Sequence, residues 1–87
     1  MDVILNASEI AEIDKQDPAT AGDGGYQSLL VGLQNKIERE TGRLRLSEDD
    51  VRRIQMYAFK YGNGGWESRL VGAFRRTLGP KLDRVNA

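Results

Sequence analysis

Residues 23–32 read DGGYQSLLVG, and residues 63–72 read NGGWESRLVG. Each stretch holds a glycine pair, an aromatic residue, a serine two positions later and the ending Leu-Val-Gly. A repeat with this spacing is typical of one supersecondary unit built twice. We therefore predict a single domain over residues 1–80, made of one repeat at 1–42 and a second at 43–80.

Each glycine pair is followed by an apolar stripe with helical spacing, so a helix is expected after each pair. We expect Asp23 and Asn63 to cap these helices, and Gly42 and Gly79 to end them. The stripes are Tyr26, Leu29, Leu30, Leu33 and Ile37 in the first repeat, and Trp66, Leu70, Ala73, Phe74 and Leu78 in the second.

The beginnings of the two repeats also match. Each starts with a short apolar piece, followed by a capping residue, Asn6 or Ser47, and by acids in the next turn. Ser47 with Asp50 has the spacing of a capping box. Pro18 should end the first of these helices, and the later one should run over about 48–61 and end at Gly62.

The expected fold class is all-α: a compact four-helix domain built from two tandem helix–helix repeats. The apolar pieces 3–5 and 43–46 are compatible with a minimal two-stranded ribbon, a helix or irregular chain. Residues 81–87 read as a frayed tail.

One repeat alone has too little apolar surface to be stable, so the two should bury their stripes against each other about a pseudo-twofold axis. The predicted core is Ile10, Ile13, Tyr26, Leu30, Leu33, Ile37, Val51, Ile54, Ala58, Trp66, Leu70 and Phe74.

The composition excludes several kinds of chemistry. The chain has 87 residues and neither cysteine nor histidine, which rules out disulfides, thiolate or imidazole metal sites and Ser-His or Cys-His nucleophiles. No apolar run approaches the roughly 18 residues of a membrane span, and the first residues do not resemble a secretory signal. We expect a cytoplasmic protein that needs no cofactor, touches no membrane and is not an enzyme, since nothing marks a buried carboxylate of raised pKa.

Charge is unevenly distributed although the net charge is zero. The acids concentrate in residues 1–50 and the bases in residues 51–87, which favours contacts with a charged partner. Candidate contacts for the partner's basic side chains are Glu9, Glu12, Asp14 and Asp17. Candidate contacts for its carboxylates are Arg52, Arg53, Arg69, Arg75 and Arg76.

Leu29 and Arg69 occupy the same position in the two repeats. Either Leu29 is exposed and anchors a partner, or Arg69 extends outward from a buried stem, or the core is wider on one side. The first of these makes Leu29 a candidate binding residue.

Two alternatives involve anions. The amides of the glycine pairs could bind phosphates at the helix starts, although the glycines could equally admit a close backbone or aromatic ring. The bases around the Gly62 turn are compatible with a small helix-turn-helix DNA-binding regulator. The would-be recognition helix, however, begins with two glycines and Glu67, where a DNA reader needs Arg, Gln, Asn or Ser.

The stretch at 62–80, GNGGWESRLVGAFRRTLGP, together with its partner at 22–32, resembles small accessory proteins of phages and mobile elements. The anti-CRISPR proteins are of this type. The resemblance implies a cytoplasmic inhibitor that binds a CRISPR surveillance complex and blocks its engagement of nucleic acid. It would act by binding a protein, as a monomer or homodimer.

Overall fold

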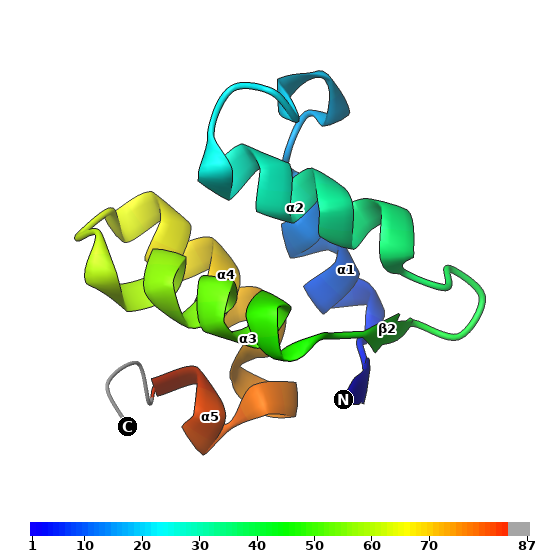
Figure 1. The fold of residues 1–87 in the computed structure, drawn as a ribbon. Coiled ribbons are helices and arrows are strands. Elements are labelled where there is room, and N and C mark those ends of the chain that lie inside the picture. The colour runs from blue at the N-terminus through cyan, green and yellow to red at the C-terminus, as the bar shows by residue number, and fades with distance from the viewer. Residues whose placement is uncertain (84–87) are drawn as a thin grey trace.

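The computed structural model describes residues 1–83 and shows a helical domain with one small ribbon (Figure 1). All-α character with four substantial helices is confirmed. The elements in chain order are β1 (Asp2–Ile4), α1 (Ala7–Asp14), a 3-10 turn (Pro18–Thr20), α2 (Gly25–Lys36), β2 (Arg43–Arg45), α3 (Glu48–Gln55), a π-helical segment (Met56–Lys60), α4 (Gly64–Leu78) and α5 (Pro80–Asp83).

The two apolar pieces form the ribbon. β1 pairs antiparallel with β2, and the central pair is Val3 with Leu44, flanked by Asp2 with Arg45 and by Ile4 with Arg43. Val3 and Leu44 are equivalent positions of the two repeats, so a twofold axis passes through this pair. Both are buried. The ribbon therefore contains the pseudo-twofold relation expected from the sequence.

The helix starts repeat in the same way at α1 and α3. Asn6 forms a capping box with Glu9, and Ser47 forms the predicted one with Asp50. In each box, the side-chain oxygen of the capping residue accepts from the backbone amide of the third helical residue. The carboxylate of that third residue accepts from the backbone amide of the capping residue. The two repeats thus start their first helices with the same hydrogen bonds.

The second helices are capped differently. Asn63 caps α4 as predicted, by accepting from the amides of Gly65 and Trp66. The expected cap of α2 by Asp23 is wrong, because Gly24 holds the capping position and offers no side chain. The amide of Asp23 instead bonds to Thr20 at the end of the 3-10 turn, which leaves this residue one position too early to cap.

The predicted end of α2 at Gly42 is also wrong, because the helix stops at Lys36. Ile37 is extended and buried, and Glu38 bridges to Arg43, so pairing with β2 replaces the last helical turn. Gly42 has φ +79° and lies so close to β1 that a Cβ would come within 2.1 Å of the Leu5 carbonyl oxygen.

The helix expected over 48–61 is present, but its last residues, Met56–Lys60, are π-helical. Gly62, with φ +67°, makes the turn into α4 as predicted. Pro18 acts as expected too, since Asp17 before it is extended.

The core lies between the repeats. α1 packs against α4, and α2 packs against α3, so each first helix contacts the second helix of the other repeat. Every residue of the predicted core is buried or packs against the buried cluster. The buried amide of Gln34 on α2 closes the end of α1 by donating to the carbonyls of Ile13 and Gln16.

The chain does not fray at residue 81. Leu82 in α5 has no exposed surface and belongs to the core, so the domain extends beyond residue 80. The rest of the predicted tail, residues 84–87, lies outside the described residues. None of the helices in residues 1–83 is both long and apolar enough to cross a bilayer.

Candidate functional site

Four aromatic side chains meet where α2 and α4 begin; we call this cluster of Tyr26, Tyr57, Tyr61 and Trp66 the aromatic end. Tyr26 stacks on Trp66 with centroids 4.6 Å apart and planes at 8°. Tyr57 meets both rings edge-on, at 5.9 Å and 5.5 Å. In Figure 1 this end is on the left, where the cyan start of α2 lies near the yellow start of α4.

Exposure increases outward through the aromatic end. Tyr26 is 2% exposed, Tyr57 and Trp66 are half-buried, and Tyr61 is 55% exposed. Tyr61 stacks on Tyr57 at 5.1 Å. A buried ring thus supports an exposed one, which fixes the outer rings on a rigid base.

The hydroxyl of Tyr26 is buried without a hydrogen-bond partner among the described residues. Burial raises the pKa of this hydroxyl, and the charge of nearby Arg69 opposes the rise. The buried base of the aromatic end therefore holds a polar hydroxyl next to a cation.

The π-helical segment positions two of these rings. Tyr57 lies within Met56–Lys60 and Tyr61 directly follows it. π-turns inside α-helices occur frequently at functional sites. The first repeat has no counterpart of this segment, since α1 ends at Asp14.

Gly25 makes room for the cluster. A Cβ at Gly25 would lie 1.9 Å from the Tyr57 hydroxyl oxygen, whereas one at Gly64 would meet nothing within 4 Å. Of the two roles considered for the glycine pairs, the close approach of an aromatic ring is thus the one present at Gly25.

Among the predicted acidic contacts, Glu9 requires correction. It is only 5% exposed, and its carboxylate accepts from Arg76 at 2.7 Å and from the amide of Asn6 at 2.8 Å. Burial by itself raises the pKa of Glu9, but the hydrogen bonds from Arg76 and Asn6 outweigh it, so the pKa is lowered. As a buried member of a capping box, Glu9 cannot meet a partner.

The other predicted acids lie on the surface with partners from the same chain. Glu12 pairs with Lys15 at 2.8 Å, Asp14 pairs with Arg39 at 2.6 Å, and Asp17 caps the 3-10 turn. These acids do not form one continuous unpaired face.

The predicted basic residues separate into two groups. Arg52 pairs with Asp49, and Arg76 pairs with Glu9 and also donates to the Ile4 carbonyl at 2.7 Å. Arg53 and Arg69 instead lie at the aromatic end. Arg75 is exposed in the last turn of α4.

Among the described residues, Arg53 and Arg69 bond only to neutral groups. Arg53 donates to the Gly25 carbonyl at 3.3 Å, and Arg69 donates to the Gln16 side-chain oxygen at 2.9 Å. Both side chains are half-buried. Each therefore gives up some hydration without a carboxylate in return.

The prediction that Leu29 is exposed is wrong. Leu29 is 2% exposed and belongs to the core, so it offers no anchor to a partner. Its equivalent, Arg69, is half-buried and extends to Gln16. The core is thus wider on the side of the first repeat.

Sequence reasoning missed Tyr57 and Tyr61 as site residues. The available signal was the run MYAFKY at 56–61, which places three aromatic residues at alternate positions just before the Gly62 turn. Tyr57 and Tyr61 are four positions apart, so a regular helix already places both on one face. Their contact with Tyr26 and Trp66 depends on how α2 and α4 pack, which no local pattern gives.

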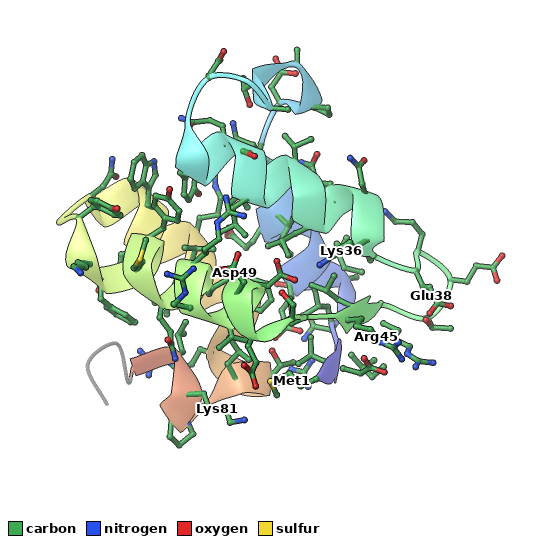
Figure 2. All side chains as sticks on the ribbon, viewed as in Figure 1. Met1, Lys36, Glu38, Arg45, Asp49 and Lys81 are labelled. Carbon is green, nitrogen blue, oxygen red and sulfur yellow. The ribbon has the colours of Figure 1, made fainter. Side chains whose placement is uncertain are left out.

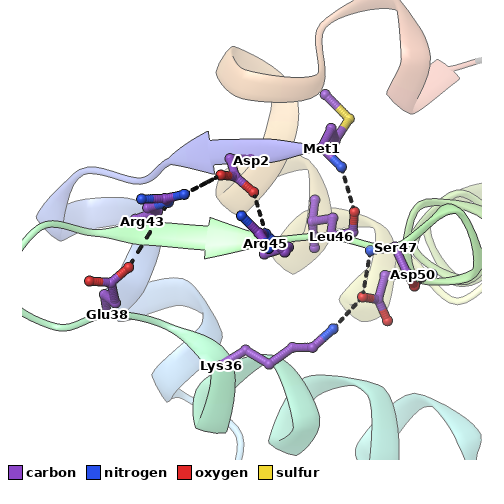
Figure 3. Close-up of polar contacts among 9 residues, drawn as sticks. All are labelled: Met1, Asp2, Lys36, Glu38, Arg43, Arg45, Leu46, Ser47 and Asp50. Atoms are coloured by element: carbon purple, nitrogen blue, oxygen red, sulfur yellow. Dashed lines mark hydrogen bonds and ion pairs between the residues drawn. The ribbon is translucent and has the colours of Figure 1, made fainter.

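The opposite end of the molecule, around the ribbon, is rich in charges that are already paired (Figure 3). Asp2 accepts from Arg45 at 3.0 Å and from Arg43 at 2.7 Å. These hydrogen bonds lower the pKa of Asp2 from 3.8 to about 2. Lys36 bonds to Asp50, which also completes its capping box. A hollow of about 330 Å³ beside Met1 is lined by Leu46, Val51, Gln55 and Lys81, among others.

No group of side chains within residues 1–83 has the composition needed to hold a metal ion. No protein-family model, no curated protein and no solved structure matches the chain.

Proposed function

We propose that the chain is a non-catalytic protein-binding domain that inhibits its partner by covering part of its surface, with the aromatic end as the interface. The observation that carries the proposal is the partly exposed aromatic cluster, with Tyr61 outermost and with Arg53 and Arg69 beside it. Tryptophan, tyrosine and arginine are the residues most enriched at the energetic centres of protein interfaces.

The ring contacts within the aromatic end support this proposal. The outer rings of Tyr61 and Trp66 rest on Tyr57 and on buried Tyr26, so binding would immobilise few side chains. An interface whose anchors are already ordered has less entropy to lose on association. A solvent-facing ring also gains more from burial than an aliphatic side chain of smaller area.

The finer form of the proposal names a CRISPR surveillance complex as the partner. It is supported by the resemblance of the glycine-rich helix starts to small phage accessory proteins, by the helical fold and by the short chain.

The alternative, a helix-turn-helix regulator, receives less support from the side chains. The first turn of α4 contains Gly64, Gly65 and the half-buried Trp66. Arg52 and Arg76, which a basic reading face would use, are paired with acids of the same chain. A DNA duplex is therefore one of the comparison probes in the binding experiment described below.

The test of the proposal uses two surface variants with matched exposure. Tyr61 is 55% exposed at the aromatic end, and Ile4 is 54% exposed at the ribbon end. The chain would be expressed in bacteria with active CRISPR immunity and challenged with a targeted phage. We expect the wild type and Ile4→Ala to restore plaque formation, and Tyr61→Ala to lose at least about tenfold of that effect.

Two results would count against the proposal. Restoration that depends on Ile4 and not on Tyr61 would move the interface to the ribbon end. Failure of the wild type against every CRISPR type tested would remove the finer form. Binding of each variant to the purified surveillance complexes, measured by size-exclusion chromatography, would show whether any effect on phage arises from direct contact.

A further inference from the structure

We infer that the partner presents an acidic protein segment to the aromatic end, where its carboxylates meet Arg53, Lys60 and Arg69. This inference rests on the proposed function and names the chemistry of the partner. It starts from the distribution of ion pairs over residues 1–83.

Most basic side chains of the described residues already form an ion pair with an acidic side chain of the same chain. Paired bases are Lys15, Lys36, Arg39, Arg43, Arg45, Arg52 and Arg76. Within residues 1–83, Arg53, Lys60 and Arg69 show no ion pair. Lys81 also shows none there, but it lies on α5, away from the aromatic end (Figure 2).

Arg53 and Arg69 lie beside the four rings, and Lys60 is next to one of them in the chain. Arg53 bonds to the carbonyl of Gly25, the residue before Tyr26. Lys60 directly precedes Tyr61. Arg69 follows Trp66 by three positions on α4, which places both on one face of the helix, and its charge acts on the hydroxyl of Tyr26.

These cations are better able to bind a partner's carboxylates than the bases that already form ion pairs. A paired base must lose its acid, or share it, before it can bind another carboxylate. Arg53 and Arg69 have already lost part of their hydration and would gain charge-assisted bonds on binding. Charge complementarity thus selects an anionic partner for this end of the molecule.

The arrangement favours carboxylates over a nucleic acid backbone. Sequence-tolerant binding of single strands uses ring faces on which successive bases stack. Here Tyr26 stacks on one face of Trp66, and Tyr57 stacks on Tyr61. These ring faces are therefore not available for stacking with bases. Exposed Asp23 and Glu67 flank the two helix starts and repel any anion placed beside them, so the site suits a short segment with a few carboxylates better than a continuous row of phosphates.

The experiment uses Trp66, the one tryptophan of the chain, as a fluorescent reporter within the site. The probe is a short blocked peptide of glutamate and serine built around one leucine, titrated into the full chain at about 20 mM salt. The comparison probes are the same peptide with glutamine in place of glutamate, a thymidine oligonucleotide and a DNA duplex.

We expect the glutamate peptide to shift the Trp66 emission saturably and the glutamine peptide to bind at least about tenfold more weakly. Arg53→Gln and Arg69→Gln should each weaken binding about three- to tenfold. Arg52→Gln is the matched control, because Arg52 is the neighbour of Arg53 on α3 and is paired with Asp49. It should leave the affinity unchanged.

Several outcomes would overturn the inference. These are equal binding of both peptides, equal effects of Arg52→Gln and Arg53→Gln, tighter binding of either DNA, or no saturable shift with the glutamate peptide. They are distinct from failure of the proposed function, which is read from Tyr61→Ala and Ile4→Ala in the phage assay. Thermal melts by circular dichroism would confirm that each variant is folded.

Discussion

The two repeats agree at one end of the molecule and differ at the other. At the ribbon end they share the strand pair through Val3 and Leu44 and the two capping boxes. They also share a crossed ion pair. In each repeat, the acid of the capping box binds a base near the end of the other repeat's second helix, giving Glu9 with Arg76 and Asp50 with Lys36.

At the aromatic end, equivalent positions hold different residues. Counting from the capping residues, Gln16 corresponds to Tyr57, and counting from the glycine pairs, Leu29 corresponds to Arg69. Gly24 leaves α2 without a side-chain cap where Asn63 caps α4. The shared features hold the fold together, so the features that differ are free to serve recognition. This comparison supports the proposal that the aromatic end is the surface used for recognition.

The largest expected effect distinguishes the buried floor of the aromatic end, Tyr26, from its exposed rim, Tyr61. Tyr26→Ala should lower the free energy of unfolding by about 3–5 kcal/mol, because it removes a buried ring and leaves a cavity beside Trp66. Tyr61→Ala should change it by less than about 0.5 kcal/mol, as is usual for an exposed side chain. Urea unfolding followed by circular dichroism measures both, and similar losses would contradict the division into floor and rim.

The second prediction compares the crossed ion pairs. Arg76→Ala should cost about 2 kcal/mol, because it strands the buried carboxylate of Glu9. Lys36→Ala should cost below about 1 kcal/mol, because Asp50 remains closer to solvent; the exposed fractions of the two acid side chains are 7% and 13%. The same unfolding measurement applies, and a larger cost for Lys36→Ala would show that burial does not set the difference.

The sequence was sufficient to predict the features that the repeats share. The core residues, the box at Ser47 and, in the second repeat, the turn at Gly62 follow from local patterns. The features that depend on contacts between repeats could not be read locally. Pairing of Glu38 with Arg43 ends α2 early, and capping of α1 buries Glu9.

The same distinction applies to the candidate site. Charge and helical spacing identified Arg53 and Arg69, but they also selected Arg76, whose partner lies 67 residues away in the chain. Symmetry with Arg69 left the burial of Leu29 open, and of the alternatives the structure shows the wider core, because burial need not be equal where the repeats diverge. The rings of Tyr57 and Tyr61 were missed because their partners, Tyr26 and Trp66, lie on other helices.

The third prediction compares equivalent glycines. Gly25→Ala should cost about 1 kcal/mol, because its Cβ would lie 1.9 Å from the Tyr57 hydroxyl oxygen and that ring would have to shift. Gly65→Ala meets only the side chain of Asn63 at 3.3 Å and should cost less than about 0.5 kcal/mol. The Trp66 emission should change for Gly25→Ala and stay constant for Gly65→Ala. The reverse pattern would mean that Gly25 does not make room for Tyr57.

The smallest effect concerns Asp2, which is replaced by Arg43 at the equivalent position of the second repeat. Hydrogen bonds from Arg45 and Arg43 lower the pKa of Asp2 from 3.8 to about 2. A carboxyl with a lowered pKa stabilises the fold fully above its unfolded pKa, and the contribution disappears as the pH falls toward the folded value. Asp2→Asn should therefore lower the melting temperature by about 1–2 °C at pH 7, and this difference should vanish between about pH 4 and pH 2.

Glu40→Gln, which changes an exposed acid with no ion pair in the described residues, is the control and should have no effect at either pH. If the difference for Asp2→Asn persisted at pH 2, its cause would be packing of the ribbon and not the charge that distinguishes the two strands.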